Sequence, residues 1–255
     1  MNNLLSANKI NKKVALGKQN ELHILKDVDV TIQRGEFVAI MGPSGSGKST
    51  LLYNISGIDR ATSGTVQFLD QRIDRMSEEE LSALRLHRMG FVFQDINLLK
   101  NLSLLDNILF PALMKNRAAK QELRGKANTL MTRMGIEGLV DNLINQGSGG
   151  QLQRVAICRA LINEPDILFG DEPTGALDSA AKAEIMDIIG DIHQEGTSVV
   201  LVTHDPKVAA RSQRVLFMQD GRISDEMVLG TYSREPGSLR AREETLSAWL
   251  IGKGH

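Results

Sequence analysis

The chain has 255 residues, long enough to bury a full hydrophobic core as one large domain or two small ones. Its 30 Lys plus Arg and 31 Asp plus Glu give a formal net charge of -1, which excludes a global basic field for recruiting nucleic acid or anionic lipid. The single cysteine, Cys158, excludes an internal disulfide framework and fits a reducing compartment, where it would be a small core residue.

Neither a membrane span nor a secretory signal is visible in the sequence. No apolar run approaches the roughly 20 residues that a membrane-spanning helix needs. The polar start, Met1-Asn2-Asn3, lacks a secretory signal pattern. We therefore expect a cytoplasmic chain.

Short apolar runs alternate with longer segments of helical period, which predicts an α/β fold with a parallel sheet flanked by helices. The expected core strands are, in chain order, residues 37–41, 91–93, 167–170 and 198–202. Short β-branched or aromatic stretches of this kind are typical of strands buried within parallel sheets.

Helices are indicated by capping signals and by one-face periodicity. Ser77 and Glu80 have the spacing of a capping box, so a helix should begin there. Apolar residues keep one-face spacing over residues 123–134, and Gly135 is a suitable C-cap for that amphipathic helix. These positions are Leu123, Ala127, Leu130, Met131 and Met134.

The segment after Gly221 is polar, which predicts a C-terminal tail that ends in a helix at residues 240–251. Trp249 and Leu250 lie near its end. One short segment with few apolar residues has weak membrane affinity, so we expect these side chains to pack on the chain itself or on a second subunit.

The clearest motif fits the phosphate-loop pattern G-x-x-x-x-G-K-[ST] and lies between the strand at 37–41 and a helical run that begins near Thr50. It comprises Gly42, Pro43, Ser44, Gly45, Ser46, Gly47, Lys48 and Ser49. Glycines let backbone N–H groups curl around phosphate oxygens, and the helix start adds a favourable dipole. We expect Lys48 to reach the β- and γ-phosphates and Ser49 to ligate Mg²⁺, with a nucleoside triphosphate bound by residues 42–50.

Polar residues follow two of the other predicted strands. Asp171 and Glu172 come after the strand at 167–170; we expect Asp171 to hold Mg²⁺ and Glu172 to act as the general base for the attacking water. His204 follows the strand at 198–202, and the carboxyl ends of such strands surround α/β binding crevices. A histidine there can donate a hydrogen bond to the γ-phosphate.

A further segment resembles the signature of ABC ATPases. It runs Ser148-Gly149-Gly150-Gln151, followed by Leu152-Gln153-Arg154-Val155-Ala156 and Arg159-Ala160-Leu161. Around it the family's other elements follow in family order: the phosphate loop, Gln94 after Phe91-Val92-Phe93, the signature, Asp171-Glu172, the turn Ala176-Leu177-Asp178, and His204. The resemblance covers roughly residues 9–223, nearly the whole chain on the scale of a domain.

The resemblance implies a P-loop NTPase core of the RecA-like kind, with a parallel sheet, a small antiparallel β subdomain and an inserted α-helical subdomain. The ATPase domain would span residues 1–225, with the helical subdomain at about 95–153, and the C-terminal tail would span 226–255 with a short helix. The helical subdomain would rotate as the dimer closes.

The resemblance also implies that two subunits, expected to be identical, sandwich two ATPs head to tail. Ser148, Gly149, Gly150 and Gln151 would act in trans on the nucleotide bound by the partner's phosphate loop. Gln94 would contact Mg²⁺ and the catalytic water and link the site to a transmembrane partner. Asp178 would couple the two sites.

Within the family, three stretches look like the lipoprotein-release and macrolide-export group, and most of all like its bacitracin and antimicrobial-peptide resistance branch. They are residues 42–52, 93–99 and 171–179. This implies an ATPase that energises a membrane permease for export or extraction of amphipathic molecules such as antimicrobial peptides, macrolide-like drugs or lipids. It would be held by the permease at the cytoplasmic face of the membrane, with no nucleic acid partner.

The sequence departs from this family pattern in two places. Gly147 occupies the position of the usual signature leucine, so we expect a lost packing contact and added backbone freedom there. Relatives also carry an aromatic residue upstream of the phosphate loop to stack on adenine, whereas residues 13–17 have none. We therefore expect looser selectivity for adenine.

Two other functions are compatible with parts of this pattern. One is a nucleotide-gated regulator of a cell-wall or sensor-kinase membrane complex. A permease partner that lacks vectorial export would favour this function. The other is a soluble ABC ATPase of DNA repair or translation. That class needs long coiled-coil insertions or tandem cassettes, and this chain has neither.

Overall fold

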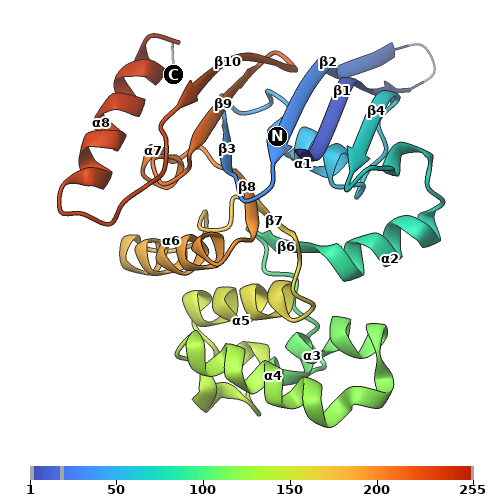
Figure 1. Cartoon of the computed structure of the whole chain (residues 1–255), viewed down its shortest axis with the longest axis vertical. Helices are drawn as coiled ribbons and strands as arrows, with labels where there is room; N and C mark the ends of the chain where they lie inside the picture. The colour runs from blue at the N-terminus through green and yellow to red at the C-terminus, as the bar shows by residue number, and fades with distance from the viewer. Residues whose placement is uncertain (1–2, 18–19, 254–255) are drawn as a thin grey trace. The chain divides into compact units, whose positions relative to one another are not determined.

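The structure is a computed structural model that describes residues 3–17 and 20–253 (Figure 1). Met1, Asn2, Gly254 and His255, which belong to the predicted polar start and tail, lie outside the described residues. The chain forms two compact units. Unit 1 extends up to Leu81 and resumes at Ser198, and unit 2 contains residues 82–197.

Unit 1 contains an antiparallel sheet with the strand order β2-β1-β4-β5. Its strands are β1 (Asn3–Leu16), β2 (Asn20–Gln33), β4 (Ser63–Phe68) and β5 (Gln71–Arg72). Leu5 and Ile10 of β1 and Leu25 and Ile32 of β2 are fully buried. This sheet is the predicted small antiparallel β subdomain.

A second group of strands in unit 1 has the order β10-β9-β3-β8. These are β3 (Phe37–Met41), β8 (Ser198–Val202), β9 (Arg214–Gln219) and β10 (Arg222–Val228). β3 is parallel to both β8 and β9, and all residues of β3 and β8 are buried. The sequence predicted both of these buried strands with the correct bounds.

Strand β10 corrects the expectation of a polar tail after Gly221. It pairs antiparallel with β9, and its residues alternate between exposed and half-buried. An edge strand with one face in solvent carries polar residues at every second position, so the segment looked like a tail. The predicted domain boundary between residues 225 and 226 falls inside this strand.

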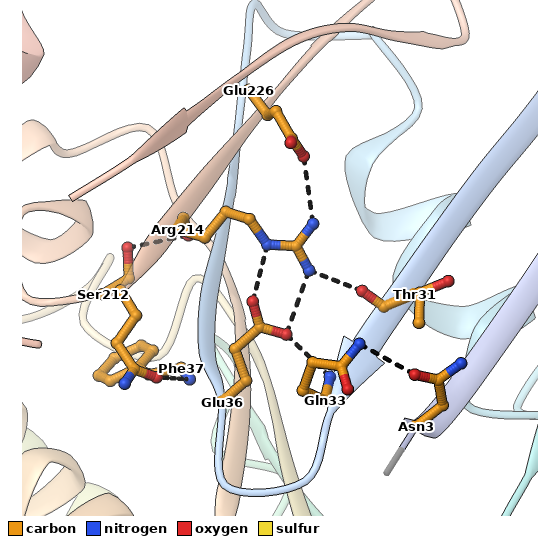
Figure 2. A network of polar contacts seen from close by, with 9 residues as sticks. Asn3, Thr31, Gln33, Glu36, Phe37, Ser212, Arg214 and Glu226 are labelled. Atoms are coloured by element: carbon orange, nitrogen blue, oxygen red, sulfur yellow. Dashed lines mark hydrogen bonds and ion pairs between the residues drawn. The ribbon is translucent and has the colours of Figure 1, made fainter. Parts of the chain in front are cut away.

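An ion-pair network ties the strands of unit 1 together (Figure 2). Arg214 donates through Nε to Glu36 Oε1 at 2.7 Å, through Nη2 to the carbonyl of Thr31 at 2.6 Å, and through Nη1 to Glu226 Oε2 at 3.1 Å. Burial alone would lower the pKa of the Arg214 guanidinium, but pairing with Glu36 and Glu226 outweighs it and raises that pKa. The network therefore joins β2, β9, β10 and the start of β3.

The helices of unit 1 are α1 (Lys48–Ile55), α7 (Pro206–Ala209) and α8 (Ser238–Ile251), with a 3₁₀ turn η1 (Ile73–Arg75). α8 begins two residues before the predicted helix at 240–251. It packs through Leu246 and Leu250 on a buried cluster that includes Val215 and Phe217 of β9. The ring of Trp249 meets that of Phe217 edge-on, with the ring centroids 5.9 Å apart. The expectation that Trp249 and Leu250 pack on the chain itself is confirmed.

Unit 2 consists mainly of helices. They are α3 (Leu104–Lys115), α4 (Lys120–Arg133), α5 (Gly149–Leu161) and α6 (Ser179–Gln194), with 3₁₀ turns η2 (Arg117–Ala119), η3 (Glu137–Leu139) and η4 (Ile144–Gln146). α3, α4 and α5 pack on one another (Figure 1). Its strands β6 (Met89–Phe93) and β7 (Ile167–Asp171) are parallel, and each is slightly longer than predicted.

The predicted helix signals are confirmed. α2 (Glu78–Arg88), which crosses from unit 1 into unit 2, begins at a capping box in which Ser77 N donates to Glu80 Oε2 at 2.7 Å and Glu80 N donates to Ser77 Oγ at 3.2 Å. Gly135 follows α4 with a left-handed φ of 64°.

Cys158 is fully buried, and this burial raises the pKa of its thiol to about 12.

Candidate functional site

The phosphate loop connects β3 to α1 in unit 1, and two of its glycines leave little or no room for a Cβ atom. A Cβ on Gly42 would lie 2.0 Å from the carbonyl oxygen of Met218, and one on Gly47 would lie 3.0 Å from Leu25 Cδ2. Both residues also have left-handed φ angles, 144° and 99°. α1 starts at Lys48, two residues before the predicted start near Thr50.

The side chains of the loop fit a bound phosphate group. Lys48 Nζ donates to the carbonyls of Gly42 at 2.9 Å and Pro43 at 2.8 Å, which holds the ammonium across the loop. Among the described residues, the buried hydroxyl of Ser46 has no hydrogen-bond partner. A cation beside the amides of a helix start, with an unpaired buried hydroxyl, forms a site for an anion.

The turn between β9 and β10 is hydrogen-bonded to the phosphate loop. Gly221 N donates to the carbonyl of Ser46 at 3.1 Å, and Lys26 N donates to the carbonyl of Gly221 at 2.8 Å. A Cβ on Gly221 would lie 2.2 Å from the carbonyl oxygen of Ile24. Sequence reasoning missed this contact, although Asp220-Gly221 is a turn signal.

His204 lies at the same sheet edge as the phosphate loop. β8 pairs with β3, and Thr203 N donates to the carbonyl of Ile40 at 3.1 Å. The exposed His204 therefore follows β8 where the loop follows β3, at the carboxyl ends of two adjacent parallel strands. The structure thus brings residues 42–50 and His204 together in unit 1.

In unit 2, the pairing of β6 with β7 brings Gln94 beside the two carboxylates. Phe93 at the end of β6 faces Asp171 at the end of β7, and Gln94 and Glu172 are the next residues. A Cβ on Gly175 would lie 3.0 Å from Gln94 Cδ, so the Gln94 side chain lies against the turn that follows Glu172.

Glu172 has a left-handed backbone conformation, with φ of 50°. Non-glycine residues adopt this region at a cost of about 1–3 kcal/mol, and such strain is concentrated at functional sites. The turn after Glu172 is closed by a hydrogen bond from Gly175 N to the carbonyl of Glu172 at 2.9 Å. This geometry is consistent with a reactive position for the Glu172 carboxylate.

A second cluster in unit 2 contains the signature residues. Ser148 is the N-cap of α5, where Ser148 N donates to Gln151 Oε1 at 2.8 Å and Gln151 N donates to Ser148 Oγ at 3.3 Å. Ser148, Gly149, Gly150 and Gln151 line a cavity of about 360 Å³ together with Asp178. The structure therefore places the predicted trans-acting residues and Asp178 around one cavity.

The backbone conformation found at Gly147 does not itself require glycine. Its φ of -105° and ψ of 146° are extended backbone that any residue adopts. A Cβ on Gly147 would lie 2.7 Å from Leu152 Cδ2, so the Leu152 side chain occupies the space beside Gly147. Gly147 is followed by a regularly capped helix, despite the missing leucine side chain.

The stretch at residues 13–17 lies at the end of β1 and presents aliphatic side chains. Val14 faces Leu22 of β2, and both are exposed, Val14 at 39% and Leu22 at 50%. The surface that lacks an aromatic residue is therefore still apolar.

Two side chains missed by sequence reasoning, the buried Gln153 and the half-buried Arg159, hold the Gln94 segment. Gln153 Nε2 donates to the carbonyls of Phe93 at 3.2 Å and Pro173 at 2.6 Å. Arg159 donates to the carbonyls of Ile96 at 3.1 Å and Asn97 at 2.7 Å. The only signal in the sequence was that both residues follow the signature on one helix.

Comparison with known proteins gives consistent matches over most of the chain. A family model described as ABC transporter matches residues 25–175. The macrolide export ATP-binding/permease protein MacB of Neisseria meningitidis is 43% identical over 220 residues, which cover 86% of this chain but 34% of MacB. The ABC transporter ATP-binding protein YvrO of Bacillus subtilis is 42% identical over 220 residues, which cover 86% of this chain and 95% of YvrO.

Solved structures show the same fold. The dimeric ATP-binding cassette MJ0796, in a post-hydrolysis state bound to ADP and Pi, matches with a TM-score of 0.83 and 38% identity over 88% of this chain and 98% of that chain. The protein cbiO1 of Clostridium perfringens, part of the transporter complex cbiONQ, matches with a TM-score of 0.79 and 30% identity over 98% of this chain and 96% of that chain. The predicted α/β P-loop NTPase fold, with its antiparallel subdomain, is confirmed.

Proposed function

This chain belongs to the ABC transporter family of ATPases, and from that premise we propose that its ATP hydrolysis drives a membrane permease. The observation that carries the proposal is the pairing of Phe93 with Asp171, which gathers Gln94, Asp171 and Glu172 at one strand edge. Carboxylates and an amide gathered in this way can hold a metal ion and orient a water, as ATP hydrolysis requires.

Each unit contributes different groups to the reaction. The phosphate loop binds the phosphates through its amides and Lys48, and His204 donates a hydrogen bond to the γ-phosphate. Glu172 accepts a proton from the attacking water, and Gln94 orients that water. Ser49, Asp171 and Gln94 would hold Mg²⁺, which would supply positive charge beside the phosphates.

Dimerisation completes each site. The first four N–H groups of an α-helix have no partner within the helix. At the start of α5, the capping box uses the Ser148 and Gln151 amides, so the Gly149 and Gly150 amides are the donors that remain for a phosphate of the partner's ATP. The dimeric MJ0796 cassette supports this arrangement.

The permease partner and the substrate class are carried over from relatives. MacB is named as a macrolide export protein with both an ATP-binding and a permease function. We infer a permease that exports or extracts amphipathic molecules, such as macrolide-like drugs, antimicrobial peptides or lipids, with this chain held at the cytoplasmic face of the membrane. Within residues 3–17 and 20–253, no helix is long and apolar enough to cross a bilayer.

The substitution Glu172→Gln tests the role of the base. It removes the proton acceptor and keeps the shape of the side chain, so ATP turnover should fall about 100- to 10,000-fold while ATP-bound dimers accumulate. Glu195→Gln is the matched control, since Glu195 is an exposed carboxylate of the same unit paired with Arg133 at 2.7 Å. Turnover by Glu172→Gln within twofold of the control would remove Glu172 from the mechanism.

A further inference from the structure

Gln153 is a buried amide at the centre of unit 2. It lies on α5, one turn after the signature, and its side chain is 1% exposed. Its Nε2 group donates one hydrogen to the carbonyl of Phe93 and the other to the carbonyl of Pro173, at 3.2 and 2.6 Å. A single NH₂ group therefore joins α5 to two separate segments of the chain.

Those two carbonyls flank the proposed catalytic residues. Phe93 directly precedes Gln94, and Pro173 directly follows Glu172. The shorter hydrogen bond goes to Pro173, in the turn where the Glu172 backbone adopts its left-handed conformation. In a buried environment such hydrogen bonds are strong and directional, so they define the positions of the peptide groups they meet.

Arg159 holds the other end of the Gln94 segment from the same helix. Its guanidinium donates to the carbonyls of Ile96 and Asn97, and burial lowers its pKa. Arg159 lies six positions after Gln153, which corresponds to about 9 Å along an α-helix. The segment from Phe93 to Asn97 is thus attached to α5 at two points, and α5 begins at Ser148 of the signature.

We propose that Gln153 is a positioning residue that fixes Gln94 and Glu172 relative to each other and links both to the signature helix. The inference rests on the proposed function, because it assigns to Gln153 the placement of two residues that act on the water. When the partner's nucleotide binds at Ser148 to Gly150, the position of α5 is transmitted through Gln153 to the catalytic carboxylate of the same chain. Gln153 is buried and donates to the backbone beside Gln94 and Glu172, so it acts through these two residues.

The substitution Gln153→Met tests this role in the purified full chain with Mg²⁺ and ATP. Methionine keeps the volume of the side chain and removes both donated hydrogens. Since displacement of a reacting group by about 1 Å can cost 100-fold in rate, we expect kcat to fall about 10- to 100-fold. The ATP affinity should stay within about twofold of wild type, because the phosphate loop lies in the other unit.

Asn163→Leu is the matched control. Asn163 also donates a side-chain amide hydrogen to a carbonyl of unit 2, that of Leu86 at 2.9 Å, away from Gln94 and Glu172. Its kcat should equal that of wild type. A Gln153→Met kcat within twofold of wild type overturns the inference, as does a parallel loss of kcat and ATP affinity, which indicates a general packing role.

Two further variants separate failure of the positioning role from failure to fold and from failure of the proposed base. If Gln153→Met does not fold, Gln153→Ala removes the same hydrogens without a new shape to accommodate, and the same outcomes apply to it. Glu172→Gln is assayed beside them. Turnover retained by Glu172→Gln rejects the proposed base, whereas loss of turnover in Glu172→Gln with normal kcat in Gln153→Met rejects only the positioning role.

Discussion

Gly221→Ala should weaken nucleotide binding although Gly221 lies far from the phosphate loop in sequence. The new Cβ would lie 2.2 Å from the carbonyl oxygen of Ile24, a backbone atom that cannot rotate away. The turn must therefore retreat by roughly 1 Å, because close-packed interiors do not tolerate such an overlap. That movement pulls the Gly221 amide away from the carbonyl of Ser46, to which it donates at 3.1 Å.

The magnitude follows from three contributions. A non-glycine residue at the φ of 80° found for Gly221 costs about 1–2 kcal/mol. Losing the hydrogen bond to Ser46 costs about 1 kcal/mol, and the forced backbone shift costs about 1–3 kcal/mol. If about 1.4 kcal/mol of this total is expressed at the phosphate loop, ATP affinity falls tenfold.

Gly35→Ala separates the clash from the backbone strain. Gly35 belongs to the same unit and has a similar left-handed φ of 70°, but a Cβ there would have no atom within 4 Å. Fluorescent-nucleotide titration and urea unfolding of both variants give the comparison. Equal ATP affinities for the two variants would refute the claim that the Gly221 turn supports the loop.

Three other substitutions or measurements test separate features. Gly147→Leu should retain ATPase activity with its permease, or raise it, because the new Cβ meets the flexible end of Leu152 at 2.7 Å; severe loss that Leu152→Ala does not relieve contradicts this. Affinities for ATP and GTP should be similar, since residues 13–17 lack a stacking ring worth about 1 kcal/mol; strong ATP selectivity would reject this view. Arg214→Met should lower the free energy of unfolding by about 2–4 kcal/mol, because it leaves the half-buried Glu36 without its cationic partner. Adding Glu36→Gln should restore part of the lost stability. Urea denaturation measures the single and double variants, and additive losses would argue against a stabilising Arg214–Glu36 ion pair.

The sequence predicted best those features that local pattern alone determines. The strands at residues 37–41 and 198–202 have the predicted bounds because every residue in them is buried and each apolar run is ended by a glycine or a polar residue, Gly42 and Thr203. β10 escaped prediction because it combines one solvent face with Asp225 and Glu226. Its identity as a strand depends on pairing with β9, which the segment itself does not encode.

The candidate site divides in the same way. Motif spacing identified the residues expected to touch nucleotide, and β6 and β7 bring Gln94 to Asp171 as expected. The supporting residues were not predictable. Gln153 acts on a carbonyl 60 positions away, and an isolated glutamine after a signature carries no sign of its partner. Only the folded backbone shows that one amide meets two segments.

The order in which the chain is synthesised gives the discontinuous unit 1 a further consequence. β3 is the central strand of its group, yet both neighbours, β8 and β9, come from the part of the chain after residue 197. A nascent chain that has completed the phosphate loop therefore carries β3 with two unpaired edges, and contacts of such long sequence separation form slowly. Met218 and Gly221, which support the loop, emerge later still. Nucleotide can thus stabilise only a chain that has been synthesised beyond Gly221, because the turn that supports the phosphate loop is not present before then.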